Sequence, residues 1–86
     1  MYMSKDQHCE ALYQAWQASE ARLNKLGKEM NKAIKKAEKI GNNDPVAYSV
    51  ACANIEDIRL MYSVLATEVT DRYTSYKVSK LQAATV

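Results

Sequence analysis

The stretch Gly41-Asn42-Asn43-Asp44-Pro45 lies at the middle of an 86-residue chain and separates two long segments that contain no other proline. Gly41 suits the end of a helix, because a residue without Cβ adopts positive φ at little cost. Asp44 can accept a hydrogen bond from a free backbone N–H of a following helix, and Pro45 fits the first helical position. The sequence therefore predicts a turn at about 41–45 between helices at about 5–40 and about 45–77, with a flexible tail at 78–86.

Apolar residues in both segments recur in steps that alternate between three and four, which is the spacing of one face of an α-helix. The ladder in the first segment is Cys9, Leu12, Trp16, Ser19, Leu23, Leu26, Met30, Ala33, Ala37 and Ile40. The ladder in the second segment is Tyr48, Ala51, Ile55, Ile58, Tyr62, Leu65, Val69, Arg72 and Tyr76. We call these the inner ladders. They predict an all-α fold, an antiparallel and coiled-coil-like hairpin of two helices in a single domain.

Counting outward from the turn gives a register for the two inner ladders. The facing pairs are then Ala37 with Tyr48, Met30 with Ile55, Leu23 with Tyr62, Trp16 with Val69, and Cys9 with Tyr76. We expect the hairpin core to consist of Leu12, Trp16, Leu23, Leu26, Met30, Ile55, Ile58, Tyr62, Leu65 and Val69.

Size and composition narrow the class of protein. A net charge of +2 does not favour nucleic acid as a partner, and two helices alone bury little apolar surface. Cys9 and Cys52 are offset by about 24 residues in the predicted register, or roughly 36 Å at 1.5 Å per residue, too far for a disulfide. We therefore expect two free thiols, a reducing compartment and, without a signal peptide or membrane span, a cytoplasmic location. Translation can start at Met1 or Met3.

The second segment carries a further apolar ladder on the side away from its inner ladder. We call the residues of this surface the outer stripe: Val46, Val50, Ala53, Asp57, Leu60, Met61 and Val64. Between the two ladders, only a narrow band is polar: Ser49, Glu56, Arg59, Ser63, Thr67 and Thr70. A helix that is apolar on two sides needs two coverings, and the first helix supplies only one. The outer stripe therefore predicts a protein-binding surface, and the alternative is scattered surface residues without a role.

A row of lysines lies on the back of the first helix: Lys25, Lys28, Lys32, Lys35, Lys36 and Lys39. Such a row can contact phosphates or an acidic partner, but it is interrupted by Glu29 and Glu38 and lacks interleaved aromatic residues. We interpret it as a solvated helix face with a few i,i+4 ion pairs.

No residues combine into a catalytic or metal site. His8 and Cys9 are the only adjacent soft ligands, and the second cysteine is far away in the predicted register. No Ser-His-Asp set and no phosphate-binding glycine loop can be assembled. We expect no enzyme activity, no cofactor and no bound metal.

Several of these residues suggest a family. The run Asp44-Pro45-Val46-Ala47-Tyr48, the later Ile55-Glu56-Asp57-Ile58 with Tyr62, and the Leu, Ala and Lys pattern of 23–39 resemble the small co-chaperones of bacterial type III secretion needle subunits, the YscE type. The likeness covers roughly residues 20 to 70, and this chain is longer at both ends than the shortest members.

The resemblance implies a helical hairpin of the bacterial cytoplasm that binds a larger helical-repeat chaperone. Together the two proteins would keep the polymerising needle subunit soluble before export. The partner face would be the outer stripe, with a contribution from Tyr48 near the turn. The resemblance also implies a role in virulence.

Other readings of a helical hairpin remain open. The chain could be a secreted needle or filament subunit, a generic coiled-coil adaptor, or an accessory that uses its lysine row on nucleic acid or a membrane surface. The free chain could also associate with itself through the outer stripe. A secreted hairpin of the WxG type is disfavoured, because Trp16 is followed by Gln17-Ala18 and the turn has no Trp.

Overall fold

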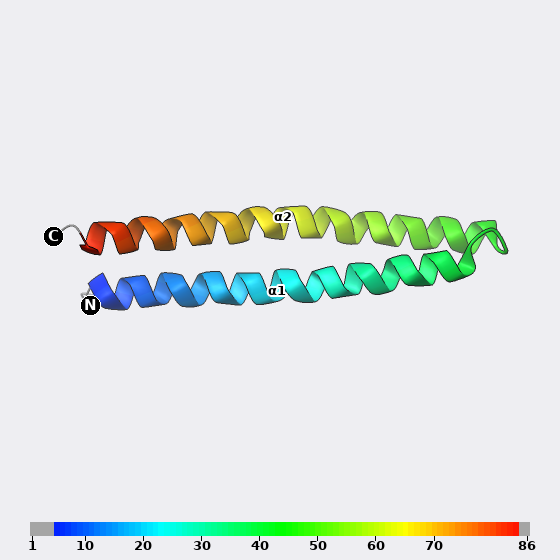
Figure 1. The fold of residues 1–86 in the computed structure, drawn as a ribbon. Helices are drawn as coiled ribbons and strands as arrows, with labels where there is room; N and C mark the ends of the chain where they lie inside the picture. Colours follow the sequence, from blue (N-terminus) through cyan, green and yellow to red (C-terminus); the bar gives the residue numbers. More distant parts are fainter. Residues whose placement is uncertain (1–4, 85–86) are drawn as a thin grey trace.

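The chain forms two long antiparallel helices joined by one short turn (Figure 1). The structure is a computed structural model that describes the backbone of residues 5–84 and the side chains of 7–84. Helix α1 spans Lys5–Ile40 and helix α2 spans Pro45–Ala84. The rod measures 64 × 19 × 16 Å. The predicted all-α hairpin is confirmed, whereas the alternative starts at Met1 and Met3 lie outside the described residues.

The turn is held by the groups that the sequence predicts. Gly41 has a φ of 50°, and its N–H donates to the Ala37 carbonyl oxygen at 3.0 Å, which closes α1. The Asp44 carboxylate accepts from the backbone N–H of Ala47 at 3.1 Å and so caps the start of α2. The Asp44 carbonyl accepts from the N–H of Tyr48 at 2.9 Å, which is the first hydrogen bond of that helix.

The predicted register is wrong by about one helical turn. Cys9 meets Ser79 rather than Tyr76, with 3.2 Å between Sγ and Oγ. Trp16 packs on Tyr73, with ring centroids 4.8 Å apart, where Val69 was expected. The inner ladders repeat with every turn, so sliding one helix by a turn still sets ladder against ladder. The observed register is the one in which the ring of Trp16 packs on the rings of Tyr73 and Tyr76.

Helix α2 is also longer than expected and continues to Ala84. The expectation of a flexible tail is therefore wrong for residues 78–84, and residues 85–86 lie outside the described part. Ser79 is held by Cys9 of α1, and Ala83 lines a shared hollow with Tyr13 and Cys9. These contacts give the last turns of α2 a surface to pack on, and Lys, Leu, Gln and Ala are good helix formers.

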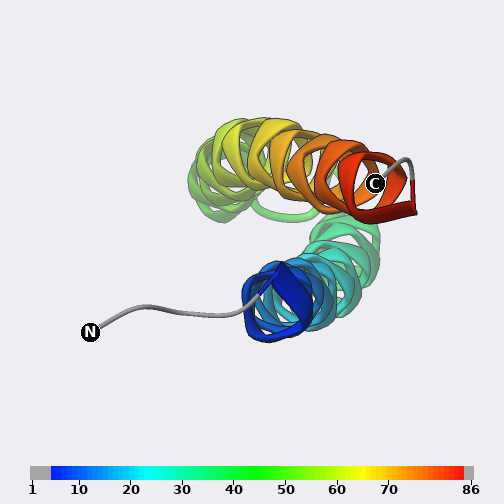
Figure 2. The ribbon, with the colours of Figure 1, turned by 90° about the vertical axis from the view of Figure 1, so that its left-hand side faces the viewer.

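The seam between the helices is half-buried along most of its length. All ten residues of the expected hairpin core are partly exposed: Leu12, Trp16, Leu23, Leu26, Met30, Ile55, Ile58, Tyr62, Leu65 and Val69. Among the described residues only Ala37, at 5% exposure, and Ser19, at 0%, are fully buried. The two helices wind around each other along the rod, as the end-on view shows (Figure 2). Two helices cannot enclose a side chain from all directions, so this fold has a seam rather than a closed core.

Candidate protein-binding surface

The outer stripe of α2 is open to solvent. Val46 is 75% exposed, Val50 66%, and Val64 72%. Leu60 and Met61 are 52% and 53% exposed, and Ala53 and Asp57 are exposed as well. At 100° per residue these seven positions occupy about 100° of the circumference of α2, so they form one continuous surface.

The polar band of α2 is exposed as predicted, and it holds a local ion pair. Arg59 donates from Nε to a Glu56 carboxylate oxygen at 3.0 Å, and from Nη2 to the other oxygen. The Arg59 hydrogen bond and charge hold the pKa of Glu56 below its usual value. Thr67 and Thr70 hydroxyls donate back to the carbonyls of Ser63 and Ala66, at 3.1 Å each. Four of the six side chains of this band are therefore hydrogen-bonded within their own helix, in contrast to the apolar outer stripe.

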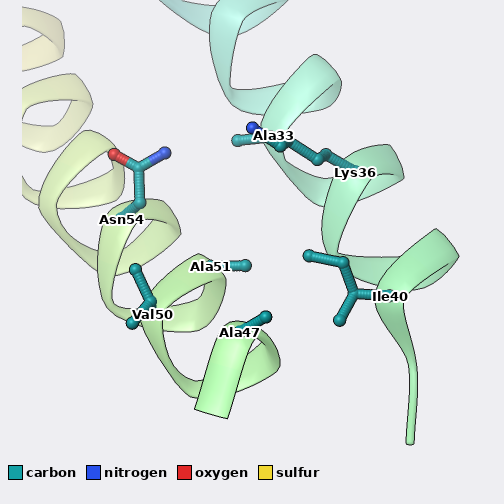
Figure 3. A pocket seen from close by; sticks show the side chains of 7 residues that line it. All are labelled: Ala33, Lys36, Ile40, Ala47, Val50, Ala51 and Asn54. Atoms are coloured by element: carbon teal, nitrogen blue, oxygen red, sulfur yellow. The ribbon is translucent and has the colours of Figure 1, made fainter. Parts of the chain in front are cut away.

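A groove opens beside the outer stripe, at the turn end of the hairpin (Figure 3). Its volume is about 490 Å³, and it lies between the last turns of α1 and the first turns of α2. The lining residues are Ala33, Lys36 and Ile40 from α1, and Ala47, Val50, Ala51 and Asn54 from α2. Three of the seven are alanines, whose short side chains leave space next to the seam. Val50 belongs to both surfaces, so the groove and the outer stripe are continuous.

Positive charge borders the same groove. The Lys36 side chain extends from α1 toward α2 (Figure 3). The other five lysines are spaced three or four residues apart on the side of α1 turned away from the inner ladder, so Lys36 alone of the row lines the groove. All six are exposed, and none forms an ion pair with another residue of the described part. The expected i,i+4 pairs are thus absent there, and the lysine charges are available to a partner.

Tyr48 lies in the first turn of α2, at the turn end of the hairpin, and is 42% exposed. Its predicted place opposite Ala37 depends on the register that the contacts of Cys9 and Trp16 contradict. A side-chain hydrogen bond with Cys52, one turn later, raises the pKa of the Tyr48 hydroxyl above its ordinary value.

An aromatic cluster closes the opposite end of the hairpin. Trp16 lies nearly parallel to Tyr76, with 5.8 Å between ring centroids, and meets Tyr73 edge-on. Tyr13 contacts both Trp16 and Tyr76, at 5.8 and 5.4 Å. Tyr13 was missed by the sequence analysis, although its place three residues before Trp16 is a usable signal. The cluster bridges the two helices, so its first role is packing.

Two further exposed apolar residues were also missed. Val78 is 47% exposed and Leu81 65% exposed, because α2 continues through the residues that were expected to be a tail. Steps of three and four lead from Val64 through Thr67, Asp71 and Thr74 to Val78. These intervening residues are polar, so Val78 and Leu81 are separate from the outer stripe.

The described residues hold no group of three or more His, Cys, Asp or Glu that could bind a metal ion. Cys9 and Cys52 are both free thiols, as their separation predicts. Neither described helix has a stretch long and apolar enough to cross a membrane. What the described surface offers is apolar area bordered by charge, which suits the binding of another protein.

No family model, curated protein or solved structure matches this chain. The resemblance to the YscE-type co-chaperones therefore depends on the residues quoted for it, and it stays a prediction.

Proposed function

We propose that this chain is a non-enzymatic protein-interaction module, a cytoplasmic co-chaperone of a bacterial type III secretion system. In this role the hairpin binds a helical-repeat partner chaperone through the outer stripe and Tyr48. The complex keeps the needle subunit soluble until export. The observation that supports the proposal is the exposure of five large apolar side chains in one row on α2.

The large accessible surface of the hairpin also supports a role in protein binding. The chain exposes 6656 Å² at a mass of 9.7 kDa. A compact monomer of that mass would expose about 5,100 Å². The hairpin thus carries an excess of surface for its size, and small chains of this kind depend on partners for stability.

The energy available from the outer stripe suits a reversible complex. Fully burying a Val, Leu or Met side chain is worth roughly 1.5–3 kcal/mol at about 25 cal/mol per Å². At their observed exposures, the five large side chains offer about 300 Å² and on the order of 7 kcal/mol. Association itself costs about 4 kcal/mol or more, so the groove with Lys36, and Tyr48, must add contacts for tight binding. Binding then stabilises the folded hairpin by mass action.

Co-purification from the bacterium that produces the chain tests this function. A tagged chain is recovered alongside two variants, Val64→Glu and Ser63→Glu, and the associated proteins are identified by mass spectrometry. Both variants add one carboxylate to the same turn of α2, but only Val64 belongs to the outer stripe. We expect a helical-repeat protein and a needle subunit with the parent chain and with Ser63→Glu, and neither with Val64→Glu.

Two results would contradict the proposal. One is recovery of the same partners with Val64→Glu, which would place the binding surface elsewhere. The other is assembly of the purified chain into fibres seen by electron microscopy, which would favour a needle or filament subunit. If the parent chain recovers unrelated helical proteins and Val64→Glu does not, the chain is a generic coiled-coil adaptor instead.

A further inference from the structure

The outer stripe has a symmetry that bears on what covers it in the free chain. From Val46 to Val64 its ladder advances in steps of four, three, four, three and four residues. This series reads the same from either end. An antiparallel copy of α2 therefore presents the same spacing in the opposite direction, which is the requirement for a self-complementary twofold interface.

We infer that, without its partner, a second copy of this chain covers the outer stripe, with the two α2 helices antiparallel and a twofold axis level with Ile55. The inference rests on the proposed role of the outer stripe as a binding surface. Beyond that role, it states which molecule covers the outer stripe in the free chain, in which direction its helix runs, and which residues face one another.

This register sets large apolar side chains against one another. Val46 of one copy lies opposite Val64 of the second copy, and Val50 lies opposite Leu60. Each of the four is more than half exposed in the single chain, so each gains burial from the pairing. Ala53 lies opposite Asp57, and its small side chain leaves room for the carboxylate.

One new ion pair is available in this register. Asn54 and Lys36 line the groove on one flank of Ala53, and Glu56 of the polar band lies on its other flank. Lys36 has no ion pair in the described part of the single chain and can form one with Asp57 of the second copy. The axis at Ile55 places the two Asp57 sites about 6 Å apart along the rod, whereas an axis at residue 57 would set the two carboxylates directly against each other, which is unfavourable.

The area indicates a weak dimer. Two copies of the outer stripe remove on the order of 600 Å² of apolar area, and the polar rim and groove bring the total near the ~1,000 Å² that a specific interface needs. We therefore expect dissociation constants in the micromolar range or weaker, so that a dedicated partner can displace the second copy.

Analytical ultracentrifugation of the full chain tests the association, from about 1 µM to about 1 mM. We expect monomer at the low end and dimer at the high end, at least tenfold weaker association for Val50→Glu, and little change for Ser63→Glu. Lys36→Glu and Asp57→Lys should each weaken association several-fold, and the double variant should recover most of it. Circular dichroism of each variant checks that the helices remain folded.

Spin labels test the direction of the pairing. In a Cys9→Ser, Cys52→Ser background, single labels at Ser63 and Thr74, both exposed, report distances between copies. The proposed axis places the two Ser63 sites about 24 Å apart along the rod and the two Thr74 sites about 57 Å apart. A parallel pair would give equal and short distances at both sites.

The inference is overturned by a chain that stays monomeric at the highest concentration, by a dimer that ignores Val50→Glu, or by equal label distances. None of these results bears on co-purification with a different protein, so failure of the dimer and failure of the proposed function can be told apart.

Discussion

Replacing Gly27 with alanine is expected to stabilise the hairpin, although this glycine lies at the seam. Gly27 is in the interior of α1, and a Cβ built there would lie 3.5 Å from Cε2 of Tyr62. That distance is ordinary van der Waals contact, so the new methyl group fits without displacing Tyr62. Alanine is about 1 kcal/mol more favourable than glycine inside a helix. We therefore expect Gly27→Ala to raise the free energy of unfolding by about 1 kcal/mol.

The same substitution at Gly41 should have the opposite sign. Gly41 has a φ of 50°, which an L residue with a Cβ adopts at a cost of roughly 1–2 kcal/mol. Its hypothetical Cβ also lies 3.5 Å from the Glu38 carbonyl oxygen, so space is not the obstacle. Gly41→Ala should lower the free energy of unfolding by about 1 kcal/mol, and the two variants should differ by about 2 kcal/mol.

Thermal and urea unfolding, followed by far-ultraviolet circular dichroism at one fixed protein concentration, measure both effects. For a chain of this size each kcal/mol corresponds to about 4–8 °C in the midpoint of thermal unfolding. Destabilisation by Gly27→Ala would mean that α1 and α2 approach more closely at this position than described. An unchanged midpoint for Gly41→Ala would refute the left-handed turn.

Two further perturbations address the aromatic end and the polar band. Trp16→Ala removes the ring that packs on Tyr73 and Tyr76 and should lower the free energy of unfolding in urea by about 2–3 kcal/mol, below the full range for a buried Trp because the ring is half-exposed. The control Gln14→Ala, on the exposed face nearby, should change the free energy of unfolding by less than about 0.5 kcal/mol. Equal effects of the two variants would show that the aromatic cluster does not hold the helices together. In an NMR pH titration the pKa of Glu56 should lie below its usual value in the parent chain and rise toward it in Arg59→Gln. Because a lowered pKa stabilises the folded chain above the unfolded pKa, this small contribution should fade as the pH falls through the folded pKa, and an identical pKa in both chains would exclude the ion pair.

The turn could be predicted residue by residue because each of its signals is local. Gly41 and Asp44 act on backbone groups within four residues of themselves, so no knowledge of the second helix is needed. The register could not be obtained in this way. The inner ladders match themselves after one turn, and the alternatives differ in contacts between the helices, such as Trp16 against Tyr73 and Cys9 against Ser79.

The outer stripe was predictable from spacing alone, whereas the groove beside it was not. The groove depends on where Lys36 and Ile40 of α1 lie relative to Val50 and Asn54 of α2, and this follows from the register. The length of α2 was underestimated for a related reason. Its last turns are held by Cys9 and Tyr13, near the other end of the chain.

Helix α1 begins and helix α2 ends at the same end of the rod, and the turn lies at the far end (Figure 1). A mechanical pull between the start of α1 and the end of α2 would load the seam one contact at a time. The Cys9–Ser79 contact and the aromatic rings would separate first, and opening would then advance toward Gly41 in steps that each cost less than global unfolding. The hairpin can therefore be peeled open from that end while the half that carries the outer stripe keeps its shape.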